Sequence, residues 1–444
     1  MSYANKNIAV LGAGESGEAA AALLKEEGAM ITILDTAEEN KLRRKIDALG
    51  PLGIRVIADL AAEHESAHGR YDMAVLSPGI DPAVPLVQNF IQRRIGMIGE
   101  LELAYEMCAC PIIGITGTNG KTTTTQLVEK MLNACGVKTV AAGNIGPAFS
   151  ARVRQSRDLD VMTLEISSFQ LETIRRFHAQ TAVWLGFAPD HLDRYHSLEE
   201  YYAAKIRIFA NQTADDWAIV NLRDKLPELA ARRITFSAYA SGGDFELQAG
   251  VICFRHERVL AMAETKLRGL HNAENLMAAL GVGFVRGLSF SEMAAPLRDY
   301  QPLPHRCEPI RVLDGVEYVN DSKGTNPDSV EKALASETRP VVLIAGGKDK
   351  GFEYDTLREL VAQKCRAVVV LGEMADRIEA LWKDRVNVAN AGWSLERAVQ
   401  LSRDLAVPGD VVLLSPGTSS FDMFKNYADR GNQFRALVNA LPAK

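Results

Sequence analysis

A glycine-bearing loop at residues 114–123, Gly-Ile-Thr-Gly-Thr-Asn-Gly-Lys-Thr-Thr, carries the strongest chemical signal in this chain. The apolar run before it, residues 111–115, predicts a strand, and Lys121 begins a predicted helix. Backbone N–H groups of such a loop can surround phosphate oxygens, the Lys121 ammonium can reach the outer phosphates, and the Thr122 hydroxyl can bind Mg²⁺. The loop therefore predicts a nucleoside triphosphate site. A plain strand–helix turn with a capping threonine is the alternative.

A second loop, with the spacing G-x-G-x-x-G at residues 12–17, follows the apolar run at residues 7–12. Asp35 stands at the end of the next predicted strand, where enzymes that bind NAD place a ribose-binding acid. The Ser-Pro-Gly turn at residues 77–79 ends another strand of the same predicted sheet. Two phosphate-binding loops in one chain indicate two different nucleotides, so we expect a nucleotide or nucleotide-sugar here. A nicotinamide cofactor and a plain set of packing glycines are the alternatives.

Strands and helices alternate in three blocks, which predicts an α/β fold with parallel sheets and right-handed crossovers. Residues 218–267 look less regular and suggest antiparallel pairing, and a proline-marked joint at 301–304 precedes the third block. We place the domains at residues 1–95, 96–302 and 303–444. Strands are expected at residues 7–12, 30–34, 71–76, 161–166, 181–185, 341–345, 367–371 and 411–414.

The composition of the 444 residues narrows the class of function. A net charge of −6 argues against a nucleic-acid or anionic-membrane surface. No apolar run approaches the ~18 residues needed to span a bilayer. The N-terminal residues enter a strand at once, so we expect no signal peptide. Six scattered cysteines fit a reducing compartment. We therefore expect a cytoplasmic protein that binds neither nucleic acid nor membrane.

Several short motifs occur in order along the chain, at residues 116–122, 143–146, 164–170, 190–194, 204–205, 271–272, 304–306 and 320–323. Together they resemble the Mur ligases, the ATP-dependent amide-forming enzymes of peptidoglycan precursor assembly, over essentially the whole chain. Residues 346–350, residues 414–425 and the Arg430-Gly431 pair look most like the members that add D-glutamate to UDP-N-acetylmuramoyl-L-alanine. The sequence lacks the Asp-Asn-Pro-Arg motif of the diaminopimelate-adding members. The alanine-adding members usually have His in place of Asn119.

The resemblance implies three domains: an N-terminal Rossmann-like domain for the UDP-sugar, a central P-loop ATPase domain, and a C-terminal Rossmann-like domain for the amino acid. It implies that the γ-phosphate of ATP passes to the L-alanine carboxylate, and that the D-glutamate amine attacks the resulting acyl phosphate. It also implies Mg²⁺ at two sites, with a carbamylated lysine supporting the second ion. Such chemistry needs positioned reactants and cations rather than a protein nucleophile. We expect the third block to swing onto the second and exclude water.

The same resemblance assigns residues to each ligand. The catalytic groups are Lys121, His191 and Lys205, and the metal ligands are Thr122, Glu165, His191 and, if carbamylated, Lys205. ATP is expected at Gly117, Thr118, Asn119, Gly120, Lys121, Thr122, Thr123, Asn272, Asn275, Arg306, Asp321 and Lys323. The UDP-sugar is expected at Gly14, Ser16, Gly17, Asp35, Thr36, Ser77, Pro78, Gly79 and Asn144. D-Glutamate is expected at Thr325, Lys350, Ser415 and Phe421, with Lys348 as a competitor of Lys350.

Two departures from the family pattern stand out. Gly186 and Ala188 replace an amide and a hydroxyl beside His191, so the loop there lacks two side-chain groups that could hold it. Ala37-Glu38 replaces the basic residue expected after Thr36, so uracil recognition is expected to depend more on backbone groups. We expect a monomer. Rival interpretations are another Mur ligase, a folylpolyglutamate synthase-like enzyme, an NAD-dependent oxidoreductase, or a non-catalytic nucleotide-binding regulator.

Overall fold

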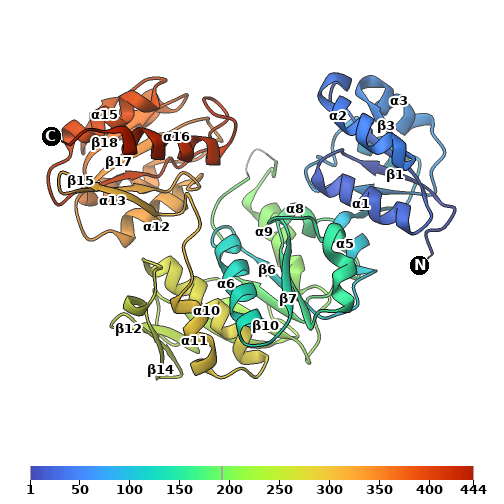
Figure 1. The fold of residues 1–444 in the computed structure, drawn as a ribbon, viewed down its shortest axis with the longest axis horizontal. Helices are drawn as coiled ribbons and strands as arrows, with labels where there is room; N and C mark the ends of the chain where they lie inside the picture. Colours follow the sequence, from blue (N-terminus) through green and yellow to red (C-terminus); the bar gives the residue numbers. More distant parts are fainter. Residues whose placement is uncertain (1, 192–193, 444) are drawn as a thin grey trace.

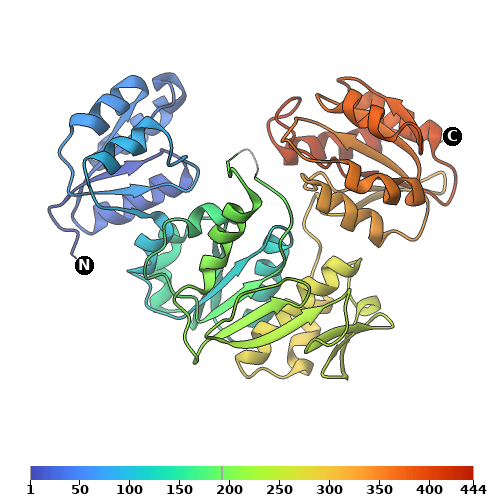
Figure 2. The ribbon, with the colours of Figure 1, turned by 180° about the vertical axis from the view of Figure 1, so that it is seen from behind.

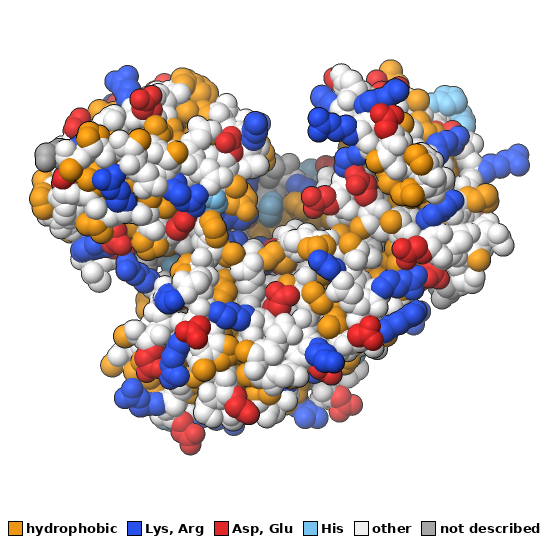
Figure 3. Space-filling model, viewed as in Figure 1, with side chains coloured by type: hydrophobic (Ala, Val, Ile, Leu, Met, Phe, Trp, Pro, Cys, Tyr) orange, Lys and Arg blue, Asp and Glu red, His pale blue; other side chains and the backbone are white. Residues whose placement is uncertain are grey.

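The computed structural model describes residues 2–191 and 194–443. Within these residues the strands form three sheets, one in each of three successive α/β domains. The first and third domains stand apart, and both rest on the middle domain, as opposite views show (Figures 1 and 2). The surface is hollowed between the two outer domains, above the middle one (Figure 3). No helix of the described chain is both long enough and apolar enough to cross a bilayer.

The first domain is a parallel sheet with the strand order β3-β2-β1-β4-β5. Residues 8–11 of β1 are fully buried, as expected for a central strand covered on both faces by helices. This sheet extends past residue 95, and the domain boundaries drawn from the sequence stay a prediction. Its elements are β1 (Asn7–Leu11), α1 (Glu15–Glu26), β2 (Met30–Asp35), α2 (Glu39–Leu49), β3 (Ile54–Ala58), α3 (Asp59–His68), β4 (Met73–Leu76), α4 (Pro85–Gln92), β5 (Met97–Gly99) and α5 (Glu100–Tyr105).

The middle domain contains the sheet β14-β13-β12-β11-β10-β9-β6-β8-β7. Helices α6 and α10 pack on one face, with Met131, Leu276 and Met277 in a continuous core. Its elements are β6 (Ile112–Thr116), α6 (Lys121–Ala134), β7 (Thr139–Gly143), α7 (Phe149–Arg152), β8 (Val161–Glu165), α8 (Ser168–Leu171), β9 (Thr181–Trp184), α9 (Leu198–Ile206), β10 (Trp217–Asn221), β11 (Arg232–Ser237), β12 (Phe245–Gln248), β13 (Val251–Phe254), β14 (Glu257–Ala261), α10 (Leu270–Val285) and α11 (Phe290–Arg298).

The expectation of antiparallel pairing over residues 218–267 is wrong for half of that segment. Strands β10, β11 and β12 continue the parallel sheet beyond β9. Only β12, β13 and β14 pair in the antiparallel sense among the strands of this described segment. The connections are short and irregular, so the sequence offers no long helix between β10 and β11 to signal a parallel crossover.

The third domain carries the sheet β15-β16-β20-β17-β18-β19, parallel except for the β15–β16 hairpin. The nine strands expected from the sequence across all domains are confirmed, and short edge strands such as β3, β5 and β19 were missed. The elements of the third domain are β15 (Glu308–Leu313), β16 (Val316–Asn320), α12 (Pro327–Ser336), β17 (Val341–Gly346), α13 (Arg358–Lys364), β18 (Cys365–Leu371), α14 (Ala375–Trp382), β19 (Asn387–Asn390), α15 (Leu395–Leu405), β20 (Val411–Leu414) and α16 (Tyr427–Ala440).

Candidate active site

The phosphate loop joins the end of β6 to the start of α6, as the sequence predicted. Gly120, at the N-terminus of α6, has a φ of 85°, and a Cβ there would lie 2.4 Å from Oδ1 of Asn275. Glycine is therefore needed both for the backbone conformation and for the close approach of α10. Nζ of Lys121 donates to the carbonyl oxygens of Gly117 and Thr118, at 3.0 and 2.9 Å. The ammonium thus lies over the loop that the sequence predicts to hold phosphates.

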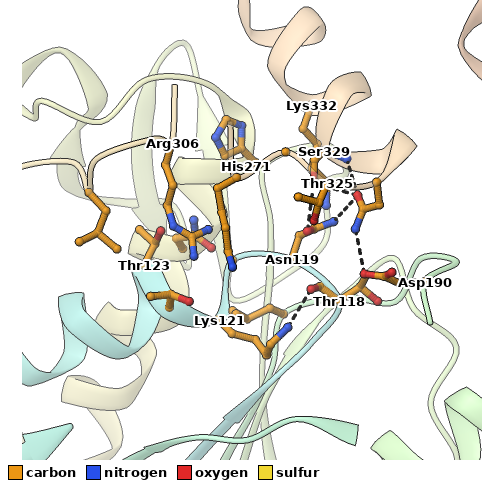
Figure 4. A pocket seen from close by; sticks show the side chains of 18 of the residues that line it. Thr118, Asn119, Lys121, Thr123, Asp190, His271, Arg306, Thr325, Ser329 and Lys332 are labelled. Carbon is orange, nitrogen blue, oxygen red and sulfur yellow. Dashed lines mark hydrogen bonds between the residues drawn. The ribbon is translucent and has the colours of Figure 1, made fainter. Parts of the chain in front are cut away.

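A cavity of about 300 Å³ opens at this loop, between the middle and third domains (Figure 4). It gathers seventeen of the predicted site residues: Thr118, Asn119, Gly120, Lys121, Thr122, Thr123, Asn144, Glu165, His191, Lys205, Asn272, Asn275, Arg306, Asp321, Lys323, Thr325 and Lys350. Residues separated by more than 200 positions in the chain therefore share one site.

Glu165 ends β8 beside the phosphate loop. Its Oε1 accepts a hydrogen bond from the side-chain amide of Asn144 at 2.7 Å. Its Oε2 is buried and has no hydrogen-bond partner among the described residues. A buried carboxylate oxygen without a partner is costly unless a ligand satisfies it. The side chain therefore fits an oxygen ligand of a bound cation in this cavity.

Lys205 lies on α9 and is almost completely buried. Its Nζ donates to the carbonyl oxygen of Gly117 at 2.8 Å and lies 5.0 Å from the centre of the Tyr201 ring. Burial, together with the positive charge of Lys121, lowers the pKa of Lys205 well below its usual value. The neutral amine that carbamylation requires is therefore formed more readily at Lys205 than at a surface lysine.

His191 follows the loop after β9, and its ring packs edge-on against Phe169 and Tyr201. Burial, reinforced by nearby lysines, lowers the pKa of His191 to about 4 despite the opposing effect of Asp190. The imidazole is thus neutral at neutral pH, which is the form that binds a metal. Residues Leu192 and Asp193 of the same motif lie outside the described residues.

The loop at residues 185–188, where this chain departs from the family pattern, is held by the phosphate loop itself. The amide of Thr118 donates to the carbonyl of Gly186 at 2.9 Å. The Thr118 hydroxyl contacts both the amide and the carbonyl of Ala188, each at 3.0 Å. Without side-chain amide or hydroxyl groups at positions 186 and 188, this loop is therefore anchored to the phosphate loop through its backbone.

The two predicted asparagines lie in the first turn and a half of α10, against α6. Oδ1 of Asn275 accepts from the Thr124 hydroxyl at 3.2 Å, and its amide donates to Asn272 at 3.1 Å. His271 precedes them, and its Nδ1 is buried without a hydrogen-bond partner among the described residues. Burial lowers the pKa of His271 to about 4. His271 thus lines the cavity with a neutral imidazole, a role that the sequence alone did not indicate.

The third domain supplies the cations on the opposite wall. Arg306 extends into the cavity from the joint between the domains (Figure 4). Nζ of Lys323 lies 4.0 Å from the centre of the Tyr427 ring, and burial, with Arg306 nearby, lowers the pKa of Lys323 to about 8. Burial raises the pKa of Asp321 to about 6, although hydrogen bonds from Ser415 and Cys307 oppose this rise. These groups face the phosphate loop across the cavity.

The predicted D-glutamate residues are only partly brought together. Nζ of Lys350 lies 3.2 Å from Oδ1 of Asp190, and Thr325 lines the same cavity. Ser415 is buried, does not line the cavity described here, and donates its hydroxyl to Asp321 at 2.7 Å. The side chain of Phe421 is 67% exposed, away from the cavity lining. Lys348, the competing lysine, is exposed and also outside the lining.

The two predicted UDP-sugar loops of the first domain lie together at the carboxyl ends of β1 and β4. Of all the residues predicted to bind the UDP-sugar, only Asn144, which follows β7, lines the cavity. Asp35 accepts the backbone N–H groups of Ala13 and Ala37, at 2.7 and 2.8 Å, and so fixes both loops. A Cβ on Gly17 would lie 1.9 Å from the carbonyl oxygen of Gly12, so only glycine permits this packing of α1 on β1. Thr36 is exposed at the edge of the loop.

Two contacts complete the loops of the first domain. The Pro78 carbonyl accepts from the guanidinium of Arg194 at 3.0 Å, which ties the Ser77–Gly79 turn to the middle domain. Lys45, on α2, donates to the carbonyl oxygen of Ala13 and pairs with Glu18. A lysine of the helix that follows Thr36 thus lies at the glycine loop. The sequence alone did not single out Lys45, although the absence of a basic residue after Thr36 is a signal that could have pointed to a lysine on α2.

Models of three protein families match the chain in succession. The first model is described as "Mur ligase MurD-like, N-terminal domain" and matches residues 6–99. The second, "Mur ligase middle domain", covers residues 115–283, and the third, "Mur ligase, glutamate ligase domain", covers residues 305–417. The three matches follow the same order as the three sheets.

Curated relatives are similar over the full length. The UDP-N-acetylmuramoylalanine–D-glutamate ligase of Geobacter metallireducens is 40% identical over 452 residues, covering 99% of each chain. The enzyme of the same name from Alkaliphilus metalliredigens is 36% identical, with the same coverage. Among solved structures, the UDP-N-acetylmuramate–alanine ligase of Thermotoga maritima superposes with a TM-score of 0.61 at 16% identity, covering 98% of this chain and 100% of that one. At that identity the likeness concerns the fold.

Proposed function

This chain belongs to the Mur ligase family, and we propose that it uses ATP to join D-glutamate to UDP-N-acetylmuramoyl-L-alanine during peptidoglycan precursor synthesis. The resemblance inferred from the ordered motifs is thereby confirmed. The observation that carries the proposal is the cavity in which the phosphate loop of the middle domain faces Arg306, Lys323 and Lys350 of the third. That arrangement suits transfer of a phosphoryl group to an acid that an amine then attacks.

The residues of the cavity divide the work by position. Lys121 binds the outer phosphates of ATP, and Arg306 and Lys323 approach them from the third domain. Asn272 and Asn275 contact the nucleotide from α10, and Asp321 accepts hydrogen bonds from it. Cations on both sides of the γ-phosphate offset the charge that gathers as it moves to the L-alanine carboxylate. This transfer releases ADP. The D-glutamate amine then attacks the carbonyl carbon of the acyl phosphate, phosphate leaves, and the amine gives up a proton as the amide forms.

Mg²⁺ fits the donor set of this cavity. Thr122, Glu165 with its unpartnered oxygen, and the neutral His191 would hold it, together with phosphate oxygens and water. When bound, the ion supplies positive charge at the phosphates. No cluster of three or more His, Cys, Asp or Glu side chains that could hold a metal ion occurs in the described part of the chain, so the phosphates have to complete the site. We propose that Lys205, carbamylated, supports a second ion.

The two other substrates are assigned to the outer domains. We propose that the UDP moiety lies on the loops that contain Gly14, Ser16 and Ser77, at the N-terminus of α1. D-Glutamate is proposed to bind between Lys350 and Thr325. Ser415 and Phe421, which lie outside the cavity lining, are proposed as further contacts from the neighbouring loop. One chain contributes every assigned group, so we propose that the enzyme acts as a monomer, in the cytoplasm.

The function is tested by phosphate release from ATP in the presence of UDP-N-acetylmuramoyl-L-alanine and one amino acid at a time. D-Glutamate should stimulate release, whereas L-alanine, L-lysine and diaminopimelate should not. Stimulation by one of the other three would assign the chain to a different member of the family. An absorbance change of added nicotinamide cofactor would instead favour the oxidoreductase.

Lowering the pH should raise the KM for ATP, because Asp321 becomes protonated. Its pKa is raised to about 6, so its ionised fraction, the better hydrogen-bond acceptor, falls as the pH drops through that value. We expect the KM for ATP to rise between about pH 7 and 5. The same titration of Asp321→Asn provides the control, because protonation of ATP itself affects both proteins equally. Parallel pH profiles would show that Asp321 does not bind the nucleotide.

Replacement of Lys45 by methionine should raise the KM for the UDP-sugar by about 3- to 10-fold. This change corresponds to the free energy of one lost hydrogen bond to an anionic or carbonyl group. Lys45 lies against Ala13, inside the loop proposed to bind that substrate. Lys41→Met is a matched control, because Lys41 is exposed on the same helix and pairs with Glu38. Equal KM values for wild type and the Lys45 variant would remove Lys45 from the site.

A further inference from the structure

The first turn of α12, in the third domain, is hydrogen-bonded directly to the phosphate loop of the middle domain (Figure 4). The side-chain amide of Asn119 donates to Oδ2 of Asp328. Its oxygen accepts from the hydroxyl of Ser329 at 3.1 Å. Both ends of one amide are therefore bonded to side chains of a helix more than 200 positions away in the sequence.

A second contact lies beside the first. Asn326 caps α12 by accepting the backbone N–H of Ser329 at 2.9 Å, and its own amide donates to Oδ2 of Asp190 at 3.1 Å. Asn326 is 2% exposed and Asp190 is 8% exposed, so this bond is shielded from water. The other oxygen of Asp190 pairs with Lys350. The cap of α12 is thus also a bridge between the two domains.

The sequence order makes this turn important for the acceptor site. Thr325 precedes Asn326 directly, and Lys323 is two positions earlier, so whatever fixes the start of α12 also fixes these two side chains at the cavity. Asp328 additionally pairs with Lys332 at 2.8 Å, which offsets its charge beside a loop proposed to bind phosphates. An unpaired acid at this position would repel the triphosphate.

We propose that Asn119 and Asp328, with Ser329, are positioning residues that dock the third domain on the phosphate loop and so assemble the D-glutamate site. This inference rests on the proposed function and extends it. Asn119 then has a role that is separate from contacting ATP, and the geometry of the acceptor depends on a side chain in the nucleotide loop.

The test compares Asp328→Ala with two other variants. Asp328→Asn keeps an oxygen that can accept from Asn119, and Glu331→Ala removes an exposed acid from the same helix. We expect Asp328→Ala to raise the KM for D-glutamate about tenfold. Small-angle scattering with Mg²⁺, a non-hydrolysable ATP analogue and UDP-N-acetylmuramoyl-L-alanine should show a larger radius of gyration than for wild type. Asp328→Asn should restore most of both properties, and Glu331→Ala should match wild type.

A double-mutant cycle with Asn119→Ala separates docking from nucleotide binding. If the pair acts through its mutual contact, adding Asp328→Ala to Asn119→Ala should change the radius of gyration and the KM for D-glutamate little further. Fully additive effects, an unchanged radius for Asp328→Ala, or an equal defect in Glu331→Ala would each overturn the proposal. Ser329→Ala replaces Asp328→Ala if the latter does not fold. Wild-type protein without D-glutamate-dependent phosphate release would refute the proposed function instead, and scattering would still test the contact.

Discussion

Lys121→Ala should lower the rate of phosphate release by at least about 10³-fold while the protein stays folded. The ammonium lies over the phosphate loop, where it contacts the carbonyls of Gly117 and Thr118. Loss of the ammonium removes the middle-domain cation that the developing charge on the γ-phosphate needs most. The measurement is ADP formation with saturating UDP-N-acetylmuramoyl-L-alanine and D-glutamate.

Folding has to be checked separately, because the two carbonyls lose a buried donor. Lys121→Met keeps most of the side-chain volume, and its thermal unfolding midpoint should lie within a few degrees of the wild-type value. Turnover by the methionine variant at more than about a tenth of the wild-type rate would show that the phosphates bind elsewhere.

Lys350→Ala should raise the KM for D-glutamate by about 10- to 100-fold and change the KM for ATP far less. Lys350 is a cavity-lining lysine on the loop that follows β17, and its charge is already matched by a carboxylate oxygen of Asp190 at 3.2 Å. A carboxylate of D-glutamate can take the same kind of charge-assisted bond. Steady-state kinetics with each substrate varied in turn provide the measurement.

Lys348→Ala is the matched control, since Lys348 lies two positions away but is exposed and outside the cavity lining. It should retain wild-type KM values. A rise in both KM values for Lys350→Ala, or a larger defect in the Lys348 variant, would transfer the acceptor role away from Lys350.

Local patterns predicted the parts of the site that depend on neighbouring residues. The phosphate loop, the helix after it and the acid at the end of β8 follow from spacing and strand polarity, and the structure brings Lys121, Thr122 and Glu165 together. The asparagines of α10 were identified through motif order. The structure adds the reason for their placement, a direct contact between Asn275 and Thr124 of α6.

The sequence did not predict which side chains make contact between the domains. Asn326-Pro327-Asp328 is a recognisable helix start, yet nothing local shows that this start faces Asn119. Lys45 reaches the glycine loop only because α2 packs beside it. Parallel pairing of β10 and β11 was missed for a similar reason, because partner and direction are set by the whole sheet. Phe421 was assigned from its motif, and its exposed position leaves that assignment a prediction.

The bridge from Asn326 through Asp190 to Lys350 has a pharmacological consequence. The seam between α12 and the phosphate loop is formed by side chains that a substrate does not have to displace in order to enter the first domain. A small molecule bound in that seam would keep the phosphate loop of the middle domain apart from the acceptor site of the third domain. Such a compound would inhibit without resembling the UDP-sugar, and a high concentration of that substrate would not relieve the inhibition.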